Sequence, residues 1–206
     1  MVIKVGLTGG IGSGKSSLAR HFRDSGVPHY DSDRRAKELM NSDAQLRKDI
    51  VELLGDSAYV MDLDGSQSLN RGFVAEQIFG DEAKRDALNK LVHPAVIRDF
   101  EQWVASKEDA AYVIFESAIL FDAELEKHFD KTVAVLAPEE LRLMRVVNRD
   151  GCTMEQAKGR MDAQLSEDEL HKRADYAVVN IFEEELEGAA KRLDQIFRYE
   201  AVKANK

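Results

Sequence analysis

The residues with the clearest chemistry form a glycine-rich run, residues 9–16, close to the N-terminus. The run fits the pattern G-x-x-x-x-G-K-[ST], in which backbone N–H groups and a helix N-terminus surround phosphate oxygens. Lys15 can then reach the β- and γ-phosphates of a nucleotide, and the Ser16 hydroxyl can ligate Mg²⁺. The predicted ATP contacts are Gly10, Ile11, Gly12, Ser13, Gly14, Lys15, Ser16, Ser17 and the distant Arg145.

The elements around this run decide whether it is more than a glycine-rich turn with a chance Lys-Ser pair. The apolar residues 2–7 precede it and predict a buried strand, and residues 17–25 predict a helix that stops at Gly26. Strand, glycine loop and helix in this order are the context that a phosphate-binding loop requires. We therefore predict that residues 9–16 bind the phosphates of ATP.

Carboxylates follow two other predicted strands. Asp31 and Asp33 come just after the second strand, and Glu116 ends the third. Because the carboxyl ends of parallel strands meet at one edge of a sheet, these acids can lie near the phosphate loop. A carboxylate there can take the proton of an attacking hydroxyl or hold Mg²⁺ through water. The alternatives are that the aspartates only cap a helix and that Glu116 is a polar loop residue.

A row of arginines marks the segment that follows the fourth predicted strand. Arg142, Arg145 and Arg149 share one face of a helix by their spacing, and Arg160 follows. Small-molecule kinases use such residues to hold phosphates and to stabilise charge during transfer. Acidic neighbours leave open a solvated helix with surface ion pairs, so we expect one or two of these arginines to function, not all four.

His93 precedes Pro94 within an amphipathic helical stretch. A lone histidine in such a stretch is more often a packed or capping residue than a ligand-binding one. The spacing alone therefore favours a structural role for His93.

The strand pattern predicts an α/β fold built on a parallel sheet, because nearly continuous apolar runs suit strands covered on both faces. The gap between the second and third strands is too long for one crossover helix and predicts a helical insertion. A polar loop is expected at 55–70 within it. A second helical insertion spans 138–173. The predicted strands are Ile3–Leu7, Val27–Tyr30, Ala111–Phe115, Thr132–Leu136 and Tyr176–Val179.

Composition limits the partners. The net charge of −9 argues against a sequence-independent nucleic-acid binder, which needs a basic face. No apolar run approaches the length of a membrane span, and no signal segment precedes the first strand, so we expect a cytoplasmic protein with no membrane partner. The single cysteine, Cys152, excludes an intrachain disulfide. We expect a monomer or small homo-oligomer.

Over almost its whole length the chain resembles the dephospho-CoA kinase family. The run from Gly6 to Ser16 is similar to the family signature, and Asp31-Ser32-Asp33 is similar to its Asp-x-Asp. Further matches in the family's order are His93-Pro94, Arg149-Asp150, Arg160-Met161-Asp162-Ala163-Gln164, Ala174-Asp175-Tyr176 and Asn180. Two stretches depart from the family pattern: residues 116–122 lack a proline and exchange both acids, and Ile181 follows Asn180 in place of a small-residue turn.

The resemblance implies transfer of the ATP γ-phosphate to the ribose 3′-hydroxyl of dephospho-CoA, with Mg²⁺ as cofactor. It implies a five-stranded parallel P-loop NTPase sheet, similar to nucleoside monophosphate kinases. The single domain 1–206 would divide into a nucleotide-binding core (1–32, 110–137, 174–206), a helical CoA-substrate domain (33–109) and a lid (138–173). The implied catalytic residues are Asp33, Lys15 and Arg149. The implied substrate contacts are Asp31, Asp33, His93, Glu116, Arg160 and Gln164.

Two other functions stay open on the sequence. Another small-molecule or nucleoside monophosphate kinase could use the same loop, although the long helical insertion and the position of His93-Pro94 count against it. A non-catalytic nucleotide-binding regulator would keep the loop but would not need Asp33 or the arginines.

Overall fold

The computed structural model describes residues 1–63 and 65–204. Asp64 of the predicted polar loop and residues 205–206 of the predicted core lie outside the described residues. In chain order the elements are β1 (Ile3–Thr8), α1 (Lys15–Asp24), β2 (His29–Asp31), α2 (Ser32–Ser42), α3 (Ala44–Leu54), η1 (Asp56–Ala58), β3 (Tyr59–Met61), β4 (Gln67–Leu69), α4 (Arg71–Ile78), α5 (Glu82–Ala105), β5 (Tyr112–Glu116), η2 (Glu126–His128), β6 (Lys131–Leu136), α6 (Glu139–Asp150), α7 (Met154–Asp162), α8 (Glu167–Arg173), β7 (Tyr176–Val179), η3 (Glu183–Glu185) and α9 (Leu186–Ala204).

Within the described residues, the central sheet has five strands in the order β2-β5-β1-β6-β7, and all neighbours run parallel. The predicted fold class is confirmed, and each predicted strand is present with ends that differ by two residues or fewer. Strand β1 lies in the middle because its residues are nearly all buried, as a strand covered on both faces requires. This order places the carboxyl ends of β1, β5 and β2 side by side.

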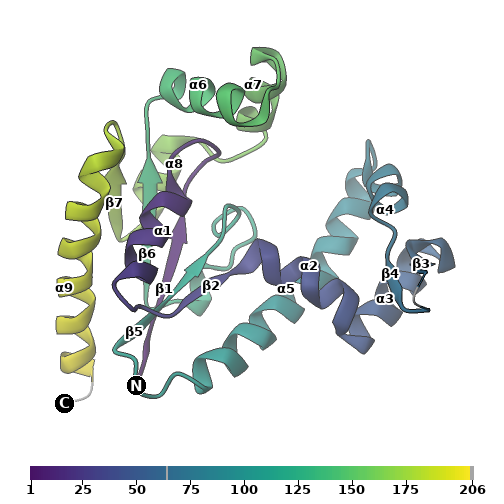
Figure 1. Ribbon diagram of the computed structural model, residues 1–206, viewed down its shortest axis with the longest axis horizontal. Coiled ribbons are helices and arrows are strands. Elements are labelled where there is room, and N and C mark those ends of the chain that lie inside the picture. Colours follow the sequence, from purple (N-terminus) through teal and green to yellow (C-terminus); the bar gives the residue numbers. More distant parts are fainter. Residues whose placement is uncertain (64, 205–206) are drawn as a thin grey trace. The chain divides into compact units, whose positions relative to one another are not determined.

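Helices α1 and α9 pack together and against the sheet (Figure 1, purple and yellow). Leu18 and Phe22 of α1 and Phe197 of α9 are fully buried in the core between these helices and the strands. Tyr112 of β5 joins the same core, with its ring centroid 5.3 Å from that of Phe197 and 6.3 Å from that of Phe22. This packing fixes the N-terminal end of α1, where the phosphate loop ends.

The chain divides into two compact units. The first, residues 1–31 and 104–206, holds the central sheet, α1 and the elements that follow β5; we call it the nucleotide unit. The second, Ser32–Trp103, holds α2, α3, α4, most of α5 and a two-stranded antiparallel sheet; we call it the helical unit. Helix α5 continues through Pro94, although proline removes one backbone hydrogen bond there.

One helix boundary of the helical unit has no counterpart among the predictions, and one prediction for this unit is wrong. Residues 34–54 belong to two helices, because the Asp43 side chain accepts hydrogen bonds from the N–H groups of Gln45 and Leu46 and starts α3. The predicted polar loop 55–70 contains η1 and the hairpin β3–β4. The strands of this hairpin are three residues each, which is too short for a visible alternation of apolar and polar side chains.

Among the described residues, none of the helices combines the length and the apolar character that a membrane crossing requires.

Candidate functional site

The phosphate loop connects β1 to α1 in a conformation that depends on glycine. Gly12 and Gly14 have φ angles of 80° and 93°, which side chains disfavour. A Cβ at Gly12 would lie 2.6 Å from the carbonyl oxygen of Arg142, and a Cβ at Gly14 would collide with the side-chain amide of Asn180. These two glycines therefore let the loop turn while other elements press against it.

Side chains from three distant segments of the nucleotide unit bond to the backbone of the loop. The N–H of Ile11 donates to Oε1 of Gln164 at 2.8 Å, and Nε of Arg142 donates to the Ile11 carbonyl at 3.0 Å. The side-chain amide of Asn180 donates to the Ser13 carbonyl at 2.7 Å. These bonds fix the backbone of the loop at Ile11 and Ser13.

Two hydroxyl groups at the loop are buried and unsatisfied. Among the described residues, the side-chain oxygens of Thr8 and Ser13 have no hydrogen-bond partner. Buried hydroxyls in folded proteins are nearly always paired, so such groups beside a phosphate loop fit a polar ligand. This observation supports an anion at the loop.

Glu116 connects the loop to the neighbouring strand. It ends β5, and its Oε1 accepts a hydrogen bond from Nζ of Lys15 at 2.7 Å and from the Ser16 hydroxyl at 2.6 Å. Its Oε2 lies 2.9 Å from Nε2 of His29, on β2. The structure thus brings the predicted residues Lys15, Ser16 and Glu116 together at the carboxyl edge of the sheet, with His29 added.

The environment keeps Glu116 ionised. Burial, the largest single effect, raises the pKa of this carboxyl. The hydrogen bond to His29, the charge of Lys15 and the remaining hydrogen bonds together outweigh it and bring the pKa to about 2. Glu116 is therefore an anion beside the two residues that would meet phosphate and metal.

This set of residues fits Mg²⁺ bound together with a nucleotide. The Ser16 hydroxyl and the Glu116 carboxylate are hard oxygen ligands, which Mg²⁺ prefers. In the described part of the chain, no group of three or more His, Cys, Asp or Glu side chains could hold a metal by itself. A site of few protein oxygens is usual for Mg²⁺, which takes its other ligands from phosphates and water.

The two aspartates predicted near the end of the second strand fall in different units. Asp31 ends β2 and lies opposite Glu116 in the β2–β5 register, at the edge of the sheet where the loop begins. Asp33 lies in the first turn of α2, in the helical unit. His93 is half-buried on α5 in the same unit, and burial lowers its pKa. The catalytic role of Asp33 and the substrate contact of His93 stay predictions.

The four arginines of the segment predicted as a lid (138–173, called the lid segment below) have different surroundings. Arg142 is buried and pairs with Glu167 at 2.9 Å, and its bond to the Ile11 carbonyl helps to fix the phosphate loop. Arg145 donates to the carbonyls of Gly12 and Asn180 at 3.4 and 3.2 Å. Arg149 and Arg160 are largely exposed, and both bond to Asp150.

The predicted ligand contacts of the lid segment thus fall into two groups. Gln164 and Arg145 contact the backbone of the phosphate loop, which the sequence did not indicate. Arg149 and Arg160 are exposed and pair with Asp150, and an exposed ion pair can be exchanged for a ligand contact with little loss. Their contacts with ATP or the acceptor stay predictions.

Sequence reasoning missed His29 and the support given by Asn180. His29 begins the three-residue strand β2, which is too short for a pattern that would single out one side chain. Its separation of 87 positions from Glu116 hides the contact from local analysis. Asn180 matches the family pattern, but its bond to Ser13 can be predicted only when the order of the strands in the sheet is known.

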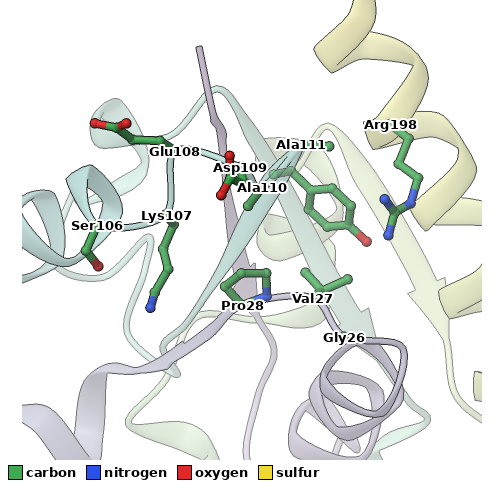
Figure 2. A pocket seen from close by; sticks show the side chains of 11 residues that line it. Gly26, Val27, Pro28, Ser106, Lys107, Glu108, Asp109, Ala110, Ala111 and Arg198 are labelled. Carbon is green, nitrogen blue, oxygen red and sulfur yellow. The ribbon is translucent and has the colours of Figure 1, made fainter.

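A hollow of about 370 Å³ lies at the edge of the sheet opposite the phosphate loop, near the amino ends of β2 and β5 (Figure 2). Residues 26–28 and 106–112 form its walls, and Arg198 of α9 reaches in from the side. Of the described residues that line it, none belongs to the predicted site. In open parallel sheets the ligand binds at the carboxyl edge, so this hollow is not the nucleotide site.

The parallel sheet, the phosphate loop and the acid at the end of the adjacent strand define the class of P-loop kinases. A sequence profile of the dephospho-CoA kinase family matches residues 3–184. The dephospho-CoA kinase of Salinibacter ruber is 41% identical over 181 residues, which cover 85% of this chain and 87% of that protein. The dephospho-CoA kinase of Bacteroides fragilis is 36% identical over 180 residues, with 87% and 85% covered.

A solved structure shares the fold over nearly the whole chain. The crystal structure of TT1252 from Thermus thermophilus has a TM-score of 0.81 and 30% identity, and the match covers 95% of this chain and 97% of that one. The chain belongs to the dephospho-CoA kinase family. It is therefore a kinase, and the family's reaction is the final step of coenzyme A synthesis.

Proposed function

We propose that this chain transfers the γ-phosphoryl group of ATP to the ribose 3′-hydroxyl of dephospho-CoA, giving coenzyme A and ADP, with Mg²⁺ as cofactor. Membership of the family supports the reaction. The observation that carries the mechanism is the cluster of Lys15, Ser16 and Glu116 at the phosphate loop. With a nucleotide at the loop, Lys15 would serve as the cation beside the β- and γ-phosphates, Ser16 as a metal ligand and Glu116 as the neighbouring acid.

Lys15 would neutralise charge on the β- and γ-phosphates as the bond to the leaving oxygen breaks. The Ser16 hydroxyl would ligate Mg²⁺, and Glu116 would hold one of its waters. The metal, when bound, neutralises the phosphate oxygens and helps to hold them in line. The unsatisfied hydroxyls of Thr8 and Ser13 can donate to the same phosphates.

Asp33 is our candidate for the base. The 3′-oxygen of the acceptor forms a bond to the γ-phosphorus while the bond from that phosphorus to the β,γ-bridging oxygen breaks. The hydroxyl proton passes to the Asp33 carboxylate, and ADP leaves with the electron pair. Asp31 is the alternative base, since it lies at the strand end opposite Glu116.

The remaining predicted residues would bind the two substrates. Arg145 and Arg149 would contact ATP and its transferring phosphate, whereas His93, Arg160 and Gln164 would contact dephospho-CoA. For Gln164 this contact is an addition to its bond with Ile11. We also expect a cytoplasmic location and small-molecule partners only.

The reaction can be tested by measuring ADP release with dephospho-CoA, nucleoside monophosphates and shikimate as acceptors. We expect dephospho-CoA to be preferred, and phosphorus NMR should place the new phosphate on the 3′-oxygen. Good turnover of another acceptor with none of dephospho-CoA would overturn the proposal.

The base can be tested separately with Asp33→Asn, which keeps the shape of the side chain but cannot take a proton. We expect kcat to fall roughly 10²- to 10⁴-fold, the effect of losing a positioned base. ATP binding, measured by calorimetry, should be unchanged, and the matched Asp31→Asn should cost less. Wild-type turnover by Asp33→Asn would leave Asp33 as a helix-capping residue and move the search to Asp31 and Glu116.

A further inference from the structure

One buried polar side chain has no part in the reaction as proposed. His29 lies on β2 with its side chain only 10% exposed, and its Nε2 lies 2.9 Å from Oε2 of Glu116. In the register of the sheet His29 is opposite Ile114 of β5. Alternate residues of a strand point to the same face, so Ile114 and Glu116 share a face and His29 can reach the carboxylate.

The charge of Glu116 determines the direction of this hydrogen bond. Oε1 of Glu116 accepts from the Lys15 ammonium and the Ser16 hydroxyl, as an ionised carboxylate does, and an ionised carboxylate only accepts hydrogen bonds. Nε2 of His29 must therefore carry the proton and donate. The sheet thus presents one fixed donor to the carboxylate, on the side away from the phosphate loop.

The two oxygens of Glu116 have separate partners. Oε1 accepts from Lys15 and Ser16, the residues of the loop that phosphate and metal would take over. Oε2 accepts from His29, which belongs to a strand and has no predicted ligand. When a nucleotide binds, the first oxygen loses its partners and the second keeps its own.

We propose that His29 is a positioning residue. Its hydrogen bond keeps the Glu116 carboxylate paired and directed at the phosphate loop when nucleotide and metal take the place of Glu116 as the partners of Lys15 and Ser16. The proposal rests on the proposed function in one respect, the use of Lys15 and Ser16 by Mg²⁺-ATP. It gives a role in nucleotide binding to a residue that belongs neither to the phosphate loop nor to the acids at the strand ends.

The cost of an unpaired buried charge is the physical reason. The Glu116 side chain is 8% exposed, so water alone cannot replace the donors it loses. Without His29, the carboxylate would either turn away from the metal or keep Lys15 and Ser16 and so compete with the nucleotide. With His29, one charge-assisted hydrogen bond remains throughout.

The test compares His29→Leu, which removes the donor, with His29→Gln, whose side-chain amide can still donate. Binding of Mg²⁺ with a non-hydrolysable ATP analogue is measured by calorimetry, and kcat and KM are measured with dephospho-CoA. We expect His29→Leu to weaken analogue binding about tenfold, the size of one hydrogen bond to a charged group, and to lower kcat. His29→Gln should recover most of both. The control His171→Leu, at an exposed histidine of α8, should match the wild type.

A double-mutant cycle isolates the contact. If His29 acts through Glu116, His29→Leu should have little further effect on analogue binding in a Glu116→Ala background. An equal effect in both backgrounds would overturn the proposal, as would equal losses in His29→Leu and His29→Gln, because these outcomes indicate packing alone.

Nitrogen NMR of the wild-type histidines covers the case in which His29→Leu does not fold. We expect Nε2 of His29 to stay protonated and hydrogen-bonded when the analogue and Mg²⁺ bind. Loss of that bond on binding would contradict the proposal. Calorimetry and NMR need no acceptor, so they give an answer even if dephospho-CoA is not the substrate.

Discussion

Among the paired charges of the nucleotide unit, one group lies at the phosphate loop and another in the lid segment. In the first, Lys15 and Glu116 are 11% and 8% exposed and are tied to Ser16 and His29 as well. In the second, Arg149 and Arg160 are 63% and 52% exposed and share a single partner, Asp150. Both are ion pairs by distance, but only the first is closed to water.

The difference indicates what each group is ready to do. A buried pair is screened little, so its members are held in place before a ligand arrives, and breaking it is costly. An exposed pair contributes little to stability and can exchange one partner for another with little loss. The loop cluster is thus suited to fixed positioning, and the lid arginines are suited to meeting a ligand that comes and goes.

The largest expected effect comes from removing the buried cation. Lys15→Ala leaves Glu116 without its charged partner and the β- and γ-phosphates without theirs. We expect kcat/KM to fall by about 10²- to 10³-fold, comparable to the loss of one preorganised donor to developing charge. Lys191→Ala on α9 removes an exposed lysine and should have no effect. Near-normal steady-state kinetics of Lys15→Ala at saturating ATP would place the phosphates elsewhere.

The next effect concerns stability and its dependence on pH. The pKa of Glu116 is lowered from 4.5 to about 2 in the folded chain, so the unfolded chain binds the proton more readily between these values. The stabilisation is complete above the unfolded pKa and is lost as the pH falls from 4.5 towards 2. It amounts to at most about 3 kcal/mol.

Glu116→Gln should remove this pH dependence. In urea unfolding between about pH 6 and about pH 3, we expect the stability advantage of the wild type over the variant to shrink as the pH falls. Glu184→Gln changes an exposed carboxyl of η3 in the same way and should follow the wild type. If the curves of wild type and Glu116→Gln ran parallel over this range, Glu116 would not be tightly paired in solution.

The smallest effect is expected from the lid. Arg149→Ala and Arg160→Ala remove exposed side chains, so the melting temperature should hardly change. If either arginine contacts the transferring phosphate, kcat should fall about tenfold while ATP affinity stays within about twofold, because the contact strengthens as charge develops. Arg192→Ala, at an exposed arginine of α9, is the control. If the steady-state kinetics of both variants are unchanged, the ion pairs of Arg149 and Arg160 with Asp150 are surface contacts without a role in catalysis.

The sequence was informative where a local pattern carries the structure. The strand before the phosphate loop and the helix after it follow from periodicity and from the glycines, and the strand-end position of Glu116 follows from the apolar run before it. Glu116 and Lys15 are 101 positions apart, and the sequence predicts only that Glu116 lies near the phosphate loop at the carboxyl edge of the sheet. The partners of Glu116 became visible only with the strand order β2-β5-β1.

Other features had no local signal at all. The hairpin β3–β4 joins two strands of three residues, and its side chains show no alternation. The end of α2 depends on one aspartate, Asp43, whose side chain caps α3. Arg142 matched the expected row of arginines, but its burial against Glu167 and Ile11 could not be read from spacing on a helix.

The supports of the phosphate loop also bear on how the protein is made. The N–H of Ile11 bonds to a residue 153 positions later, and the carbonyl of Ser13 bonds to one 167 positions later. On the ribosome, the loop is synthesised well before Gln164 and Asn180, so these bonds cannot form while the chain between them is still being made. Contacts between such distant residues form late, because the intervening chain must be ordered first. The phosphate loop therefore waits for segments translated much later before it gains its full set of contacts.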